Sequence, residues 1–386
     1  MQDMKRLSYI LAALLPALAG CHETVFTPRP TIPLVYSIVQ DSTGQSALVK
    51  SYGTLGEDGS IAIIGPSEET VILAESLLTA DLVNNIDGSS RPDSLPDFSG
   101  EHFDLLLDPV NAPYEQFIGA GTDKLRENTV RLAVFAMDSL CRLNPYSPEN
   151  LRKKSRAKIL VFSSTAVSGW GQFDVDTLIQ LSGGRPLTVS PVQALLAEAL
   201  VGGDNVNLCV WASPLVAECG VYESAHAWLR GESTLKVFTP RVEGDLRARF
   251  RDILLQYRKS GAPLPVHSLL LDDFGASVPD IMAEADSIRA GFSEDDMALA
   301  KVLAPDFRII EATEAISRYC YRLMRQENIF THNIAYPSAS LYRTELDHDG
   351  TMVLVELQDR YMPPTLADFL DAFAVKTRSF YVSDND

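Results

Sequence analysis

Short runs of apolar residues, each about as long as a β-strand, alternate along the chain with longer segments of helical periodicity. The runs are continuous rather than alternating, as in Ile61–Ile64, Ile159–Phe162 and Val206–Trp211. A strand that is apolar on both faces has to be covered on both faces, which parallel strands flanked by helices achieve. The order of strands and helices therefore predicts an α/β fold with doubly wound, mostly parallel sheets.

The chain length predicts two Rossmann-like lobes, because the 386 residues exceed the roughly 250–300 at which one hydrophobic core stops growing. Residues 142–157 contain two prolines and a basic cluster, and we expect them to connect the lobes. The first lobe is then expected over 34–145 and the second over 155–386. The second ends in a β-hairpin around Asp349-Gly350, and whether that hairpin packs back on the first lobe is open.

The beginning of the chain has the layout of an export signal. Lys5-Arg6 is a short basic segment, and the apolar stretch Leu7–Ala17 is shorter than the about 20 residues that a membrane-spanning helix needs. Leu18-Ala19-Gly20-Cys21 follows, and this order resembles the lipobox of bacterial lipoproteins.

The lipobox resemblance implies that residues 1–20 are a signal peptide and that Cys21 carries a lipid anchor with palmitate-type acyl chains. Residues 21–33 contain three prolines and are expected to form a tether. Position 22 is His rather than the Asp of inner-membrane retention, which favours the outer membrane of a bacterial envelope.

The chain is strongly acidic, with a formal net charge of -18. Such a surface repels the phosphate backbone of nucleic acids, so we expect no nucleic-acid partner.

Four cysteines follow Cys21, namely Cys141, Cys209, Cys219 and Cys320. Buried free thiols are the simplest interpretation, and a bridge between Cys209 and Cys219 is left open. No paired Cys or His spacing typical of zinc occurs, so we expect neither a metal nor a cofactor.

Polar residues follow many of the predicted strands, where ligands of open α/β sheets bind. We find no GxSxG, P-loop, GxGxxG or HExxH motif. Trp170, between two glycines, is expected in a loop where its ring stacks on a ligand or fills the surface between the lobes. Each polar candidate could equally cap a helix or close a turn. The candidate ligand-binding residues are Ser67, Glu68, Thr70, Asp108, Asn111, Ser163, Ser164, Trp170, Ser213, Asp272 and Asp273.

The segments GPSEET at 65–70 and RAKILVFSSTAVSGWG at 156–171, in an exported chain with two expected lobes, resemble the type 1 periplasmic-binding-protein fold. This resemblance implies a ligand held between the lobes, with Ser67 and Thr70 among its contacts.

We therefore predict a lipid-anchored extracytoplasmic protein that binds a small polar solute, rather than an enzyme. Two alternatives stay open. One is an envelope hydrolase or lyase that uses Asp272, Asp273 or Asp108 with a metal or a bound water. The other is an accessory lipoprotein whose acidic body binds another envelope protein.

Overall fold

The structure is a computed structural model that describes residues 30–361, apart from 42–43, 45–47, 49–57, 120, 202, 204, 230–231, 332 and 334. The predicted signal peptide and Cys21 lie outside the described residues. Within that part, no helix combines the length and the apolar character that crossing a membrane requires.

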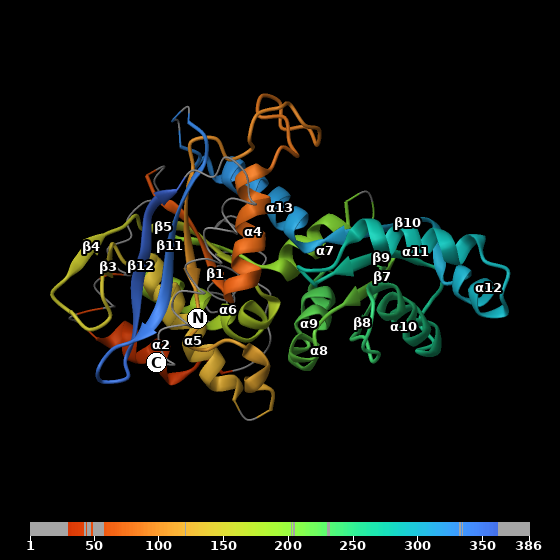
Figure 1. The fold of residues 1–386 in the computed structure, drawn as a ribbon, viewed down its shortest axis with the longest axis horizontal. Coiled ribbons are helices and arrows are strands. Elements are labelled where there is room, and N and C mark those ends of the chain that lie inside the picture. Colours follow the sequence, from red (N-terminus) through yellow and green to blue (C-terminus); the bar gives the residue numbers. More distant parts are fainter. Residues whose placement is uncertain are drawn as a thin grey trace, which may run out of the picture.

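Two sheets organise the chain into two lobes (Figure 1). The first lobe has the strand order β4-β3-β12-β11-β2-β1-β5-β6, and the second has β10-β9-β7-β8. The first sheet contains β1 (Ser60–Gly65), β2 (His102–Leu107), β3 (Leu140–Arg142), β4 (Leu151–Lys153), β5 (Ala157–Phe162), β6 (Leu187–Val189), β11 (Ser338–Leu346) and β12 (Met352–Tyr361). The second contains β7 (Asn207–Trp211), β8 (Thr234–Phe238), β9 (Val266–Leu271) and β10 (Leu303–Glu311).

Helices cover both sheets. The first lobe carries α2 (Pro33–Gln40), α4 (Ser67–Thr79), the short 3-10 helix η2 (Tyr114–Phe117), α5 (Thr122–Met137) and α6 (Thr165–Ser182). The second carries α8 (Pro214–Cys219), α9 (Val221–Trp228), α10 (Leu246–Lys259), α11 (Val278–Ala290) and α12 (Glu294–Ala300). Two further helices, α7 (Pro191–Ala199) and α13 (Ala312–Glu327), pack against each other where the chain passes between the lobes (Figure 1).

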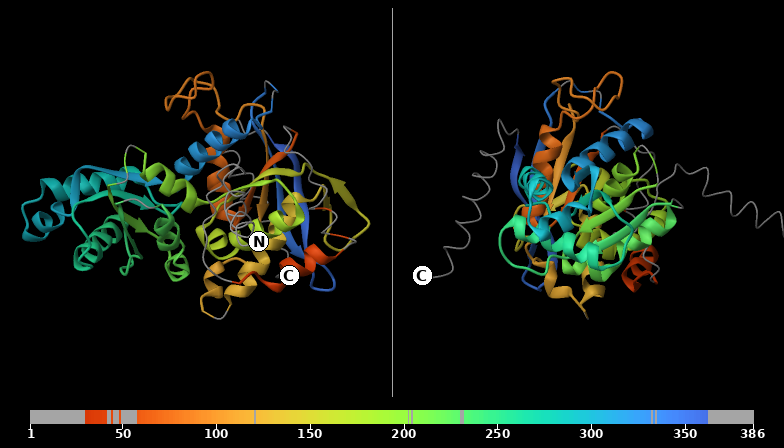
Figure 2. Two further views of the ribbon diagram at one scale, coloured as in Figure 1. Left: turned by 180° about the vertical axis from the view of Figure 1, so that it is seen from behind. Right: turned by 90° about the vertical axis from the view of Figure 1, so that its right-hand side faces the viewer.

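The predicted fold class is confirmed. All strand pairs of the second sheet are parallel, as are those that join β6, β5, β1, β2 and β11 in the first. Every residue of β1 and of β5 is buried, which accounts for their continuous apolar sequences. The C-terminal hairpin of β11 and β12 does return to the first sheet, where β11 pairs with β2, and it lies on the side away from the second lobe (Figure 2).

The connection between the lobes differs from the predicted one. Residues 142–157 contain the end of β3 and all of β4, an antiparallel pair at the edge of the first sheet, and β5 then pairs with β1. The chain enters the second lobe only after α7, which starts at Ser190-Pro191 with a capping box between Ser190 and Gln193. Prolines and basic residues had indicated a linker because an exposed edge hairpin has the same composition as a linker.

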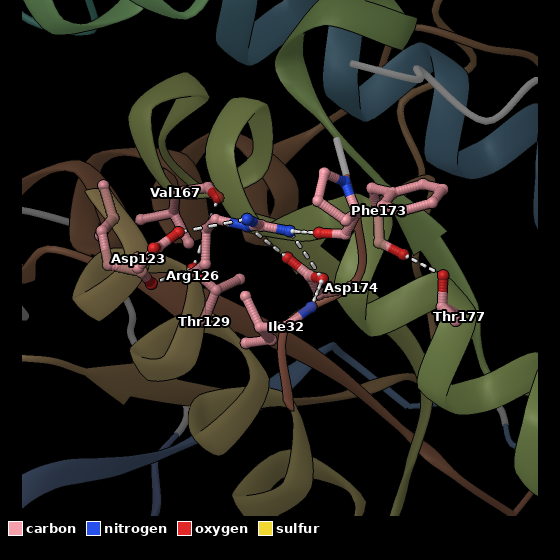
Figure 3. A network of polar contacts seen from close by, with 10 residues as sticks. Ile32, Asp123, Arg126, Thr129, Val167, Phe173, Asp174 and Thr177 are labelled. Atoms are coloured by element: carbon pink, nitrogen blue, oxygen red, sulfur yellow. Dashed lines mark hydrogen bonds and ion pairs between the residues drawn. The ribbon is translucent and has the colours of Figure 1, made fainter. Parts of the chain in front are cut away.

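A buried ion pair ties the start of the described chain to two helices of the first lobe (Figure 3). Arg126 of α5 lies 2.7 Å from Asp174 of α6, and their side chains are 7% and 0% exposed. The Asp174 carboxylate also accepts the backbone N–H of Ile32 at 3.0 Å, and the Arg126 guanidinium donates to the carbonyl oxygen of Pro30 at 2.7 Å. The segment before α2 is therefore held by the same pair that joins α5 to α6.

We expect Arg126→Met to destabilise the fold by about 3–5 kcal/mol, because it leaves the Asp174 carboxylate buried without a cation. The free energy of unfolding in urea measures this loss. Asp123→Asn is the matched control, because Asp123 also contacts Arg126, at 3.2 Å, but is 81% exposed. Its effect should stay within about 0.5 kcal/mol, and losses of equal size in the two variants would contradict the proposed role of the buried pair.

Candidate functional site

A cleft of about 800 Å³ lies between the two lobes. Its walls are formed by the segments that follow strands of both sheets, because the carboxyl ends of those strands face the same gap. After β1 come Ser67, Glu68 and Glu69, after β5 Ser164 and Thr165, after β7 Ser213, and after β9 Asp272 and Asp273.

Six of the predicted residues line this cleft: Ser67, Glu68, Ser164, Ser213, Asp272 and Asp273. The other five, Thr70, Asp108, Asn111, Ser163 and Trp170, are not among its lining residues. The hydroxyls of Thr70 and Ser163 lie 2.8 Å apart, and both residues are fully buried, so they join α4 to the end of β5 instead of contacting a ligand.

Asp108 is a structural carboxylate. It is fully buried and accepts hydrogen bonds from Tyr114 at 2.8 Å, Thr344 at 2.7 Å and Asn111 at 3.0 Å, and Asn128 donates a further one. Because both of its oxygens are occupied, its effect on the cleft is indirect, through Tyr114, which lines the wall. Within the described part of the chain, no cluster of His, Cys, Asp and Glu could hold a metal ion.

Trp170 is not in a loop, as its two flanking glycines had suggested, but inside α6, where it is only 9% exposed. The glycines serve close packing of helices. A Cβ atom on Gly169 would come within 3.1 Å of the Cys219 sulfur, and one on Gly171 would clash with Thr129 of α5. The predicted stacking role of Trp170 is therefore replaced by a packing role.

Glu69 is a cleft residue that the sequence interpretation missed. It lies in the first turn of α4, and its Oε2 atom is shielded from solvent with no hydrogen-bond partner among the described residues. The pKa of Glu69 is raised to about 8, mainly by burial. A hydrogen bond from Ser164 lowers this pKa, and the negative charges of Asp272, Glu115 and Asp273 raise it.

Asp272 lies at the end of β9 in the second lobe and is 9% exposed. The hydroxyl of Thr165, in the first lobe, donates to its Oδ1 at 2.9 Å, while its Oδ2 has no hydrogen-bond partner in the described structure. Burial raises the pKa of Asp272 to about 6, although the Thr165 and Tyr222 hydroxyls lower it.

The two carboxyl groups have opposite protonation states near neutral pH. With a pKa of about 8, Glu69 is mainly protonated, and with a pKa of about 6, Asp272 is mainly ionised. They come from different lobes, and their hydrogen-bond donors Ser164 and Thr165 are adjacent in the chain. Two titratable groups whose pKa values are driven apart can act as a general acid and a general base.

The second-lobe wall also carries a cation. The Arg249 guanidinium lies 2.8 Å from the Asp273 carboxylate and 4.9 Å from the centre of the Trp211 ring, and all three residues line the cleft. Cysteines 141, 209, 219 and 320 are buried thiols, so Cys209 and Cys219 form no bridge, and none of them lines the cleft.

No protein-family model and no curated protein matches this chain. Among solved structures, it is similar to the glutamate racemase isoform RacE1 from Bacillus anthracis, with a TM-score of 0.50 and 13% identity over 75% of this chain and 90% of that chain. It is also similar to the glutamate racemase from Francisella tularensis in complex with D-glutamate, with a TM-score of 0.49 and 13% identity over 76% and 91% of the two chains.

The prediction of a solute-binding protein is wrong. The two-lobed fold is similar to that of an enzyme, the Bacillus anthracis racemase. The cleft between the lobes contains two carboxyl groups with displaced pKa values. A lack of known sequence motifs had suggested binding without catalysis, but an acid–base pair assembled from two lobes has no fixed spacing in the sequence.

We expect Glu69→Gln to remove part of the pH dependence of stability. Between the ordinary pKa of 4.5 and about 8, the unfolded chain loses the Glu69 proton while the folded chain keeps it, so rising pH destabilises the wild type. Relative to the variant, the wild type should lose roughly 1 kcal/mol per pH unit in this window, as measured by urea unfolding at a series of pH values.

Glu294→Gln is the control for this measurement, because Glu294 is exposed in the first turn of α12, outside the cleft. Its stability should follow the wild-type pH profile. A Glu69→Gln profile parallel to that of the wild type from pH 4.5 to 8 would show that burial does not raise the Glu69 pKa.

Proposed function

We propose that this chain is an enzyme that moves protons on a small polar substrate bound between its lobes, with Asp272 as the general base and Glu69 as the general acid. The observation that carries the proposal is the pair itself: each carboxyl group lines the cleft and keeps one oxygen without a hydrogen-bond partner in the described structure. Each of these oxygens is shielded from solvent beside the cleft and has a lone pair that no protein donor occupies.

The reaction that fits this pair is proton transfer at a carbon atom next to a carbonyl or carboxyl group. Asp272 accepts the proton of the C–H bond, and Glu69 returns a proton to the carbon, so the substrate is isomerised without change of mass. The Thr165 hydroxyl stabilises the Asp272 carboxylate before transfer, and the Ser164 hydroxyl stabilises the Glu69 carboxylate that forms. The name of the Bacillus anthracis racemase supports an isomerisation by analogy of fold.

A second candidate is the hydrolase or lyase that uses carboxylates at strand ends. The same pair favours it, because a protonated and an ionised carboxyl group can protonate a leaving group and activate a water molecule. The mass of the product separates the two candidates, since hydrolysis adds a water molecule and elimination splits the substrate.

The proposed acid and base predict a bell-shaped dependence of activity on pH. Activity should rise as Asp272 ionises near pH 6 and fall as Glu69 ionises near pH 8. The measurement is hydrogen–deuterium exchange at the α-carbon of amino and hydroxy acids in deuterium oxide, followed by NMR. Asp272→Asn and Glu69→Gln should each lower the exchange rate by about 10²–10⁴-fold.

Glu294→Gln should keep the wild-type rate in the same assay. If exchange survives in both cleft variants, the assignment of Asp272 and Glu69 is overturned. If the wild type exchanges none of these compounds but releases a product of altered mass from a glycoside, amide or ester, the second candidate replaces the first.

We also propose that the enzyme is held in the bacterial envelope by a lipid on Cys21, on the strength of the order of basic segment, apolar stretch and lipobox. Cells that express the full chain should incorporate labelled palmitate into the wild type and not into Cys21→Ala, and the variant should leave the membrane fraction. Cys320→Ala is the control, because that thiol is buried. Labelling that persists in Cys21→Ala would refute the anchor.

A further inference from the structure

Charged groups are distributed unevenly around the cleft. Among its described lining residues are five carboxyl groups, those of Glu68, Glu69, Glu115, Asp272 and Asp273, and a single cation, Arg249. Glu68 and Glu115 are exposed, whereas Asp272 is nine-tenths buried. Because Glu69 is mainly protonated and Arg249 offsets Asp273, the excess negative charge comes from Glu68, Glu115 and Asp272. It therefore extends from the rim to the buried part of the site, where low polarity strengthens it.

The one cation of the described lining is already engaged. Arg249 donates to Asp273 at 2.8 Å, and its guanidinium stacks over Trp211. The pair of Arg249 and Asp273 is neutral as a unit, so an anionic ligand that approached the guanidinium would also meet the adjacent carboxylate.

The helix ends offset this excess only in part. The N-terminus of α4 bears a partial positive charge, but Glu68 and Glu69 occupy its first turn. The Ser164 hydroxyl, at the start of α6, is hydrogen-bonded to Glu69. These two positions thus already serve carboxyl groups of the protein, whereas the first turn of α6 contains no acid and can receive the α-carboxylate of an amino acid.

Acceptors, by contrast, are available. Asp272 lines the cleft, and its shielded Oδ2 atom has no hydrogen-bond partner in the described structure. A buried carboxylate that lacks donors at one oxygen is costly, and a ligand that brings N–H groups and a positive charge beside it reduces that cost. An ammonium or a guanidinium group supplies both.

We propose that the cleft selects a small organic cation, a substrate with an amine or guanidinium side group and no net negative charge, and rejects dicarboxylic amino acids such as glutamate. This inference rests on the proposed function in that the bound cation is taken to be the substrate. It sets the site apart from the substrate named for the similar racemase of Bacillus anthracis.

Three amino acids that differ in side-chain charge test the charge preference by calorimetry on the full chain at low ionic strength. L-lysine should bind at least about tenfold more tightly than L-norleucine, which lacks only the side-chain ammonium, and L-glutamate should not bind at millimolar concentration. Glu68→Gln combined with Glu115→Gln should weaken L-lysine about tenfold, and Glu294→Gln should leave it unchanged.

The outcomes separate this inference from the proposed function. Tighter binding of L-glutamate or L-norleucine than of L-lysine, or no binding of L-lysine at all, overturns the charge preference. Selective binding of L-lysine without α-carbon exchange at any pH supports the charge preference and counts against the proposed isomerisation. Exchange that is fastest with L-glutamate supports the proposed function and overturns the inference drawn here.

Discussion

Because the central strands are buried on both faces, their side chains cannot contact a ligand, and this determines where a site can form. No residue of β1 or β5 reaches solvent, so polar side chains collect where these strands end. Carboxylates buried within the first lobe, such as Asp108 and Asp174, are surrounded by donors. Glu69 and Asp272 each keep one oxygen without a hydrogen-bond partner in the described structure, and they do so beside the cleft. Asp176 also keeps such an oxygen but does not line the cleft, so the position beside the cleft is what distinguishes Glu69 and Asp272.

The general position of the site was predictable because strand ends can be recognised in a sequence. Continuous apolar runs located β1, β5 and β9, and the residues after them, Ser67, Ser164 and Asp272, do meet in one cleft. Glu69 was not predictable, because neighbouring residues of a helix point about 100° apart and only the phase of α4 decides which acid is shielded. Its neighbour Glu68 is exposed, although the two residues are identical in type and adjacent in sequence.

Two predictions from local composition were wrong, because the same composition occurs in two kinds of structure. The segment 142–157 was expected to be a linker, but two of its basic residues bind the end of a helix. Lys154 donates to the carbonyl oxygen of Ala136 and Arg156 to that of Met137, both in the last turn of α5. Likewise, glycines beside Trp170 indicated a loop but allow α6 to approach its neighbours closely. In both cases the contact that decides the structure comes from a segment that is distant in the sequence, so no local sequence pattern predicts it.

The hydrogen bond from Thr165 to Asp272 joins a donor and an acceptor of different lobes. The pKa of Asp272 therefore depends on how the two lobes lie relative to each other. Burial is the largest cause of the raised Asp272 pKa, so a swing that parted the lobes and admitted water would lower it. By thermodynamic reciprocity, protonation of this carboxyl group would then favour the arrangement in which the lobes stay together. The acidity of the medium would then influence how closely the two lobes approach each other.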